Sequence, residues 1–259
     1  MSAILHFIFA SVLLALNSSV PAHCVGCDFR GMDLHGQDLR NVAWVGADLR
    51  NANLSGANLS GSKLAGINLR DADLRSADLR DVTMAGSDLR GARLNGAQLT
   101  GIKLAGANLS GAFLDGLADD QARALLSHCA GCNVSHVTLR GKNLDGIRAA
   151  GSSFDGSDLS HSSLRNADLQ ADDFRGTNLQ GANLSGAVLC GHDTDSENGV
   201  VRYGRLHCSD LAEADLRGAN LSGVQSCDYV RGGERRCSPL DARTLRETAH
   251  ANLQGASGI

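Results

Sequence analysis

The chain is poor in large rings: aromatic residues make up 3% of its 259 positions, with 6 Phe, 2 Tyr and 1 Trp. It also contains only 2 Pro and 3 Met, against 31 Gly. A globular core built from a chain of this length normally contains more aromatic side chains. The composition therefore favours a thinner and more regular structure than an ordinary globular domain.

Excess charge is also lacking, since the formal net charge is −4. This balance gives neither the basic footprint of a nucleic-acid-binding protein nor a strong acidic field. No Ser/His/Asp set, Cys/His set, phosphate-binding loop or acid pair can be placed, and the 9 His have no spacing typical of metal ligands. We therefore expect no enzymatic activity, no catalytic residues, no cofactor, no metal and no nucleic-acid partner.

Residues 1–22 contain no Asp, Glu, Lys or Arg. An apolar run from Ile4 to Leu16 is followed by a small-residue pattern ending at Ala22, as in a signal peptide with its cleavage site. The run is shorter than the roughly 20 residues of a membrane-spanning helix. We expect a signal peptide over 1–22, no stable membrane span in the mature chain and a periplasmic or secreted location. A buried N-terminal helix is the alternative.

Eight cysteines follow the expected cleavage site, and an even count in an exported chain favours disulfides. Sequential pairing is the simplest scheme, although four bridges allow many other connectivities. The candidate disulfide or cap residues are Cys24, Cys27, Cys129, Cys132, Cys190, Cys208, Cys227 and Cys237.

What the chain has in abundance is a five-residue repeat. From Phe29 to Leu114 a large apolar residue recurs at every fifth position through 18 pentads, usually with a small residue two positions earlier. In an extended segment these two positions lie on the same face. The chain must therefore turn after every pentad to keep both inside, and a Gly or Asn two positions after the apolar residue permits that turn.

A second period of 20 residues relates groups of four pentads. The segments 42–46, 62–66, 82–86 and 102–106 resemble one another more than they resemble their neighbours. Four pentads therefore form one coil, and coils stacked at the strand spacing of about 4.8 Å form a one-dimensional array.

Pentads such as Ala-Asp-Leu-Arg-Asn at 47–51 and Ala-Asn-Leu-Ser-Gly at 52–56 resemble the A(D/N)LXX pattern of the pentapeptide-repeat family. The resemblance implies an all-β solenoid, a right-handed quadrilateral β-helix. Some members of that family bind DNA gyrase by mimicking duplex DNA and so protect cells from quinolones. The export signal, the small net charge and the Arg residues of the first block depart from that activity.

The repeat is interrupted twice, by a segment typical of a short helix at 117–128 and by a polar segment expected to be a loop. Ser238 and Pro239 are typical of the N-cap and the first residue of a helix, and they predict a C-terminal capping helix that ends near Thr248. Ala149 and Asp172 break the pattern at inward positions. The expected divisions are a signal peptide (1–22), block 1 (23–116), a helical interruption (117–133), block 2 (134–190), a polar loop (191–205), block 3 (206–226) and a Cys-containing cap (227–259).

A His-Cys-X-Gly-Cys motif occurs twice, at 23–27 and 128–132, each time directly before a block of pentads. The Cys-X-X-Cys spacing fits half of a zinc site or a thiol–disulfide catalyst. However, the whole first block separates the two motifs, and the βαβ context of a thioredoxin is absent. A structural staple that covers the end of a coil is the favoured interpretation.

Two surfaces of the first block are candidates for binding. Columns of Arg beside Asp, such as Arg30 with Asp28, form either an anion-binding strip or a self-neutralising ladder, and we favour the ladder. A flatter side carries small side chains and few charges, which fits the docking of a partner or a second copy. Its residues are Trp44, Val45, Lys63, Ala65, Ala85, Lys103 and Ala105.

The sequence thus favours a non-enzymatic, exported structural or protein-interaction solenoid with an unknown protein partner or with self-association. The first alternative is a DNA-mimicking, topoisomerase-binding protein. The second is a thiol redox or metal-handling protein that acts through the two His-Cys-X-Gly-Cys motifs.

Overall fold

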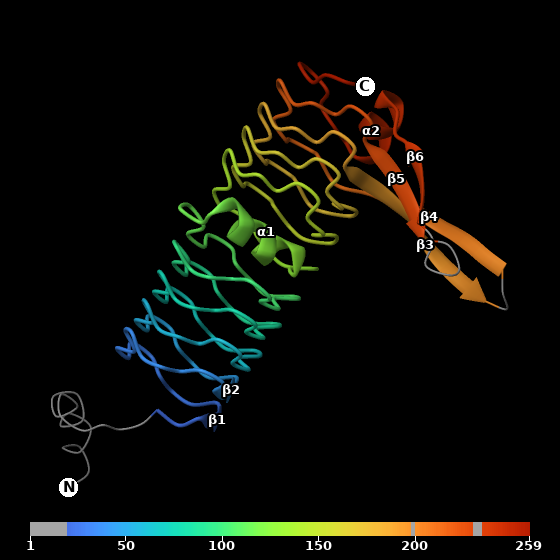
Figure 1. Cartoon of the computed structure of the whole chain (residues 1–259). Helices are drawn as coiled ribbons and strands as arrows, with labels where there is room; N and C mark the ends of the chain where they lie inside the picture. Colours follow the sequence, from blue (N-terminus) through green and yellow to red (C-terminus); the bar gives the residue numbers. More distant parts are fainter. Residues whose placement is uncertain (1–19, 198–199, 230–234) are drawn as a thin grey trace, which may run out of the picture.

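The computed structural model describes residues 20–197, 200–229 and 235–259. The predicted signal peptide therefore lies almost entirely outside the described residues. Figure 1 shows an elongated stack of short coils, with helix α1 (Asp119–Ser127) partway along it and longer strands at the C-terminal end. No described helix has the length and hydropathy needed to cross a membrane.

The pentad pattern directly sets which side chains are inside. In most pentads the central apolar residue and the residue two positions earlier are buried, as at Leu54 and Ala52. The residues on either side of the central one point outward. Most pentads contribute only one bridge, and β1 (His23–Val25) and β2 (Ala43–Val45) are short parallel strands.

Parallel bridges join residues 20 positions apart, so four pentads make one coil, as the 20-residue period predicts. Asp28 bridges Asp48: the Phe29 amide donates to the Asp48 carbonyl and the Asp48 amide donates to the Cys27 carbonyl, both at 2.8 Å. The four columns of pentads are called walls here. Walls one to three begin with the pentads centred on Phe29, Leu34 and Leu39, and the fourth wall begins with the pentad centred on Cys24.

Left-handed backbone at the corner after each pentad turns the chain from one wall to the next. The corner residue has φ 62° at Gly31 and φ 58° at Asn41. Gly adopts this conformation without steric cost, and Asn tolerates it better than most residues. The predicted role of Gly and Asn in the turns is therefore confirmed at these corners.

Helix α1 replaces one pentad of the third wall. The bridge between Asn108 and Asn133 spans 25 residues, so this coil is five residues longer than the others. The helix buries Ala122, Leu125 and Leu126 against the core. The Gln121 side chain accepts a hydrogen bond from the Leu99 amide at 2.6 Å, which satisfies a donor that the missing pentad would have paired. The predicted helix at 117–128 is confirmed.

The expected polar loop at 191–205 is wrong, because β3 (Val188–Glu197) and β4 (Val200–Cys208) form an antiparallel hairpin there. The hairpin begins on the fourth wall, where Val188 bridges Asp168. Beyond the hairpin, Asp173 bridges Asp210, so the coils resume with an offset of 37 residues instead of 20. Because 37 is not a multiple of five, the pentads of block 3 have a different phase in the sequence from those of block 2. The backbone hydrogen bonds of a hairpin do not depend on alternating apolar residues, so the polar sequence did not predict it.

Strands β5 (Gln225–Tyr229) and β6 (Arg235–Pro239) extend the hairpin into a sheet with the order β4-β3-β5-β6. The expected N-cap at Ser238 is wrong, because Ser238 pairs with Ser226 inside this sheet. Helix α2 (Ala242–Thr248) begins later, and the Asp241 side chain caps it by accepting the Thr244 amide at 2.7 Å. Leu245 of this helix is fully buried at the C-terminal end of the core.

Candidate functional site

The cysteines form four disulfides in sequential order: Cys24–Cys27, Cys129–Cys132, Cys190–Cys208 and Cys227–Cys237. In the first two pairs, one cysteine is the central residue of a fourth-wall pentad and the other is the inward small residue of the next pentad. Both side chains therefore point into the core across one corner, with Cα atoms 6.0 Å and 5.2 Å apart. The spacing of three residues follows from the register of the pentads.

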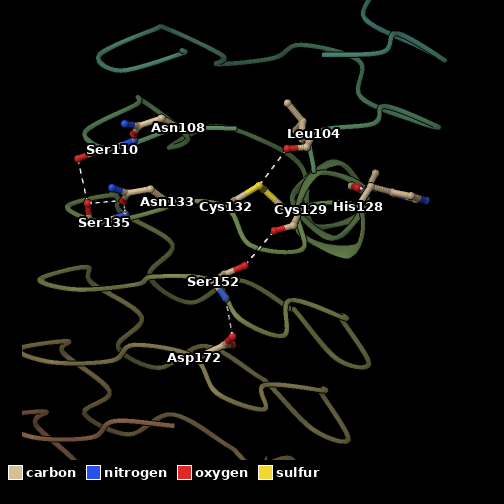
Figure 2. The surroundings of a disulfide bond; sticks show 11 residues. Leu104, Asn108, Ser110, His128, Cys129, Cys132, Asn133, Ser135, Ser152 and Asp172 are labelled. Carbon is tan, nitrogen blue, oxygen red and sulfur yellow. Dashed lines mark hydrogen bonds between the residues drawn. A yellow bond between two sulfur atoms is a disulfide. The ribbon is translucent and has the colours of Figure 1, made fainter. Parts of the chain in front are cut away.

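The two corner disulfides differ in accessibility. Cys129 and Cys132 are 0% and 2% exposed inside the stack, whereas Cys27 is partly exposed in the first coil. Figure 2 shows the inner pair between neighbouring coils: the Cys132 sulfur lies 3.2 Å from the Leu104 carbonyl oxygen. The Ser152 hydroxyl donates to the Cys129 carbonyl at 2.9 Å. The inner disulfide is thus enclosed by protein on both sides along the axis.

The histidine of each His-Cys-X-Gly-Cys motif lies on the opposite side of the backbone from its cysteine. Figure 2 shows His128 turned outward while Cys129 points inward, and the His128 Nδ1 is 3.0 Å from the Ala124 carbonyl oxygen of α1. Adjacent residues of an extended segment alternate in direction, so His128 and Cys129 cannot bind one ion together. Within the described residues no group of three or more His, Cys, Asp or Glu could hold a metal ion.

Asp172 is the one carboxyl group at an inward small position of the described coils, and it is 1% exposed. Most hydroxyl groups at the same position donate to a carbonyl 23 residues earlier, as Ser157 does to Val134 and Thr177 to Phe154. The Oδ1 atom of Asp172 instead accepts the Ser152 amide at 2.9 Å, and its Oδ2 atom has no partner among the described residues. Burial raises the pKa of Asp172 well above its usual value, and the charge of Asp168 raises it further.

The outward faces of walls one to three carry Asp–Arg pairs within single pentads. The Nη2 and Oδ2 atoms of each pair lie 2.5–2.8 Å apart, and the Arg30 side chain, donating to Asp28, lowers the pKa of that carboxyl to about 2. The predicted self-neutralising ladder is therefore confirmed. The arginines that bind the Asp two residues earlier are Arg30, Arg40, Arg50, Arg75, Arg80, Arg90, Arg175 and Arg217.

Trp44 does not belong to the predicted interaction face, so that assignment is wrong. It is fully buried as the central residue of its pentad, its indole donates to the Pro21 carbonyl at 2.7 Å, and its ring centroid lies 4.8 Å from that of Phe29. The other predicted members do point outward on the fourth wall. Val45, Lys63, Lys103 and Ala105 are exposed, and Ala65 and Ala85 are half-buried.

The fourth wall is longer than the sequence indicated, because it continues across the coil that contains α1. Its first seven pentads are centred on Cys24, Trp44, Leu64, Met84, Leu104, Cys129 and Ala149. The residue after each central residue is Val or Ala and the corner residue is Gly throughout, from Val25–Gly26 to Ala150–Gly151. Subtracting the five extra residues of the α1 coil would have shown that Ala130 and Ala150 extend the same column.

No carboxylate lies in these seven pentads. Lys63, Lys103 and Arg148 are exposed there and make no ion pair within the part of the chain that the structure describes. They recur at every second coil, which places them about 10 Å apart at the strand spacing. This part of the fourth wall is therefore a flat, weakly cationic surface roughly 30 Å long. It ends one coil before the β3–β4 hairpin, at the pentad centred on Leu169, which contains Asp168.

A family model described as pentapeptide repeats matches the chain with eight copies. The matched residues are 27–66, 52–91, 84–116, 127–166, 167–191 and 205–225. No curated protein matches the chain. Two trypsin-treated variants of QnrB1, a plasmid-mediated fluoroquinolone resistance protein, have a similar fold with TM-scores of 0.62. The first is 19% identical, with 79% of this chain and 91% of that chain covered, and the second is 18% identical, with 78% and 90% covered. HetL from Nostoc sp. is 22% identical with a TM-score of 0.30, over 82% of this chain and 92% of that chain.

Proposed function

This chain belongs to the pentapeptide-repeat family, and we propose that it is an exported, non-enzymatic, right-handed four-sided solenoid that binds a protein partner through its fourth wall. The observation that carries this proposal is the contrast between the walls. Asp–Arg pairs decorate walls one to three, whereas the fourth wall is free of carboxylates over seven pentads.

The chemistry of the fourth wall indicates the kind of partner. Val and Ala side chains beside Gly corners leave a flat surface that loses little conformational entropy when it is covered. The unpaired ammonium and guanidinium groups of Lys63, Lys103 and Arg148 favour an acidic partner by electrostatic complementarity. A second copy of this chain fits less well, because many of its own carboxylates are already bound to arginines.

The four disulfides support an exported location, because disulfides persist mainly in oxidising compartments. Cell fractionation with N-terminal sequencing and thiol titration tests this part of the proposal. We expect a chain that starts near His23, is found outside the cytoplasm and has no free thiols. An unprocessed cytoplasmic chain with reduced cysteines would refute export.

Site-specific photocrosslinking in the native cell tests the binding surface. Ala65 and Ser60 follow the central residues of two consecutive pentads, and both are half-buried, but they lie on the fourth and third walls. We expect a photoreactive residue at Ala65 to crosslink to one defined protein, and the same residue at Ser60 to give no such product. Equal products from both positions, or none from either, would contradict the proposal.

Charge reversal is the second arm of this test. We expect Lys63→Glu combined with Lys103→Glu to abolish the crosslink at Ala65, because two of the three cations would then repel an acidic partner. Sedimentation of the purified protein separates self-association from binding of a different protein.

A DNA-mimicking role remains the alternative, supported by the fold shared with QnrB1. The Asp–Arg pairs weigh against it, because each arginine neutralises the carboxylate that would have to resemble a DNA phosphate. A supercoiling assay with purified gyrase tests this role. If micromolar protein causes no inhibition of gyrase and gives no protection from a quinolone, the DNA-mimicking role is excluded. The redox and metal-handling alternative is weakened by the enclosed Cys129–Cys132 pair.

A further inference from the structure

A cavity of about 390 Å³ lies on the outside of the solenoid where the first wall turns into the second. The outward ladder of the second wall passes through it in the order Asn53, Asp73, Arg93, Phe113, and each residue bridges the next. The volume is in the usual range for small-ligand sites.

Phe113 and Arg93 depart from the Asp and Asn residues that precede them in the outward ladder. Phe113 is 50% exposed, and the other large hydrophobic residues exposed among those described are Val25, Val45 and Ile259. The guanidinium carbon of Arg93 lies 5.7 Å from the centroid of the Phe113 ring. Arg93 precedes the central residue of its pentad instead of following it, so it has no Asp two residues earlier and forms no ion pair within the described residues.

The opposite side of the cavity consists of the corner residues Asn51 and Asp71, with φ 58° and 57°. A Cβ atom at Gly91 would lie 2.3 Å from the Asp71 Oδ1 atom, so the missing side chain at Gly91 leaves the room that this carboxylate occupies. Neither the Asn51 amide nor the Asp71 carboxylate makes a side-chain hydrogen bond in the described parts of the chain. By contrast, Asp73 is bound by Arg75 and Asn53 donates to Asp33.

The cavity therefore brings together a half-exposed ring, the guanidinium that contacts this ring, a carboxylate and an amide. The last three groups form no side-chain hydrogen bond or ion pair among the described residues. The formal charges of Asp71 and Arg93 cancel, and Arg75 neutralises Asp73, which disfavours both polyanions and cations as ligands. The planar polar groups donate and accept hydrogen bonds, which disfavours a purely apolar ligand. A ligand with hydroxyl groups on its rim and an apolar C–H face for the ring satisfies all four groups.

We propose that this cavity binds a neutral sugar unit of a glycan. The hydroxyl groups of the sugar would form hydrogen bonds with Asn51, Asp71 and Arg93, and an apolar face of the sugar ring would pack against Phe113. This site lies on a different wall from the protein-binding surface proposed above. Its failure would therefore leave that proposal unaffected.

Titration calorimetry with neutral hexasaccharides, namely maltohexaose, cellohexaose and the hexamer of N-acetylglucosamine, tests the proposal, with dextran sulfate as the anionic comparison. We expect at least one neutral probe to bind. Phe113→Ala should weaken that binding by about tenfold, because the ring supplies the apolar contact of the site. Phe113→Tyr should retain it.

Arg93→Ala provides a second loss-of-binding variant that leaves the exposed ring itself in place, and Gln98→Ala is the matched control. Gln98 occupies the same register position in the next pentad, on the third wall. The absence of binding by every neutral probe, binding of dextran sulfate alone, or binding that neither Phe113→Ala nor Arg93→Ala weakens would each overturn the proposal.

Discussion

At the scale of the residue, Asp172 is the clearest conflict between the pentapeptide pattern and its environment. Its neighbours in the inward column are Ser152 and Ser209, whose hydroxyl groups donate to carbonyl groups of the coils. A buried carboxylate cannot donate, and its ionised form is strongly disfavoured by low polarity. The raised pKa means that Asp172 binds a proton more tightly in the folded chain than in the unfolded chain.

This difference gives the stability of the protein a defined pH dependence. The stabilisation from the Asp172 proton is fully present below the pKa of an unfolded Asp, and it is lost as the pH rises toward the folded value. We expect Asp172→Ser to raise the free energy of unfolding at pH 8 by about 1–3 kcal/mol. The serine hydroxyl can donate to the Ala149 carbonyl, as the Ser152 hydroxyl donates to the Cys129 carbonyl 23 residues earlier.

Denaturant unfolding at pH 5 and pH 8 checks this prediction. The increase in the free energy of unfolding caused by Asp172→Ser should be smaller at pH 5 than at pH 8. Asp172→Asn should behave like the serine variant, because asparagine is neutral at both pH values. An identical effect of Asp172→Ser at both pH values would show that the ionisation of Asp172 does not contribute.

At the scale of the element, the two corner disulfides have the same sequence motif and different surroundings. Cys24–Cys27 lies in the first coil with no described coil outside it, whereas Cys129–Cys132 lies between coils. The surrounding coils must separate before a thiol reagent can reach the inner pair. The rate of its reduction should therefore follow local unfolding.

Reduction followed by alkylation and mass spectrometry measures this difference. In the native protein we expect Cys24 and Cys27 to be labelled after mild reduction, while Cys129 and Cys132 are labelled only after denaturant is added. Fully denatured protein, in which all cysteines react, is the control. Equal labelling of both pairs in the native protein would indicate that the inner pair is open to solvent and would revive a redox role.

At the scale of the whole molecule, the two ends of the solenoid are not equivalent. In the first coil the backbone N–H and C=O groups of Asp28, Asp33 and Asp38 face away from the stack, without a backbone partner among the described residues. At the other end, Leu245 and Ala249 are buried in the core. A repeat array unfolds most easily from its least covered end, so the first coils should open before the rest.

The single tryptophan reports on this opening. Trp44 is in the second coil and contacts Phe29 of the first, so its fluorescence should change when these coils separate. We expect the urea midpoint of Trp44 fluorescence to be lower than the midpoint of far-ultraviolet circular dichroism. Phe29→Ala should lower the fluorescence midpoint further and leave the circular dichroism midpoint nearly unchanged. Coincident transitions would instead show that the solenoid unfolds as one unit.

Much of this architecture was determined by local sequence. Every pentad places a large apolar residue, a small residue and a turn residue at fixed positions, so burial at Leu54 and Ala52 and the left-handed corner at Asn41 need no distant contact to be predicted. The 20-residue period added the number of pentads in a coil. The register that places Cys24 and Cys27 inside was also present in the sequence.

The tertiary structure alone decided how the interruptions are accommodated. The length of the α1 coil, the hairpin at 188–208 and the pairing of Ser238 with Ser226 depend on contacts between residues far apart in the chain. The same is true of the fourth wall, which Ala130 and Ala150 join because coils of different length are stacked. A five-residue pattern specifies which way each side chain points, but only the stacking of the coils specifies which side chains become neighbours.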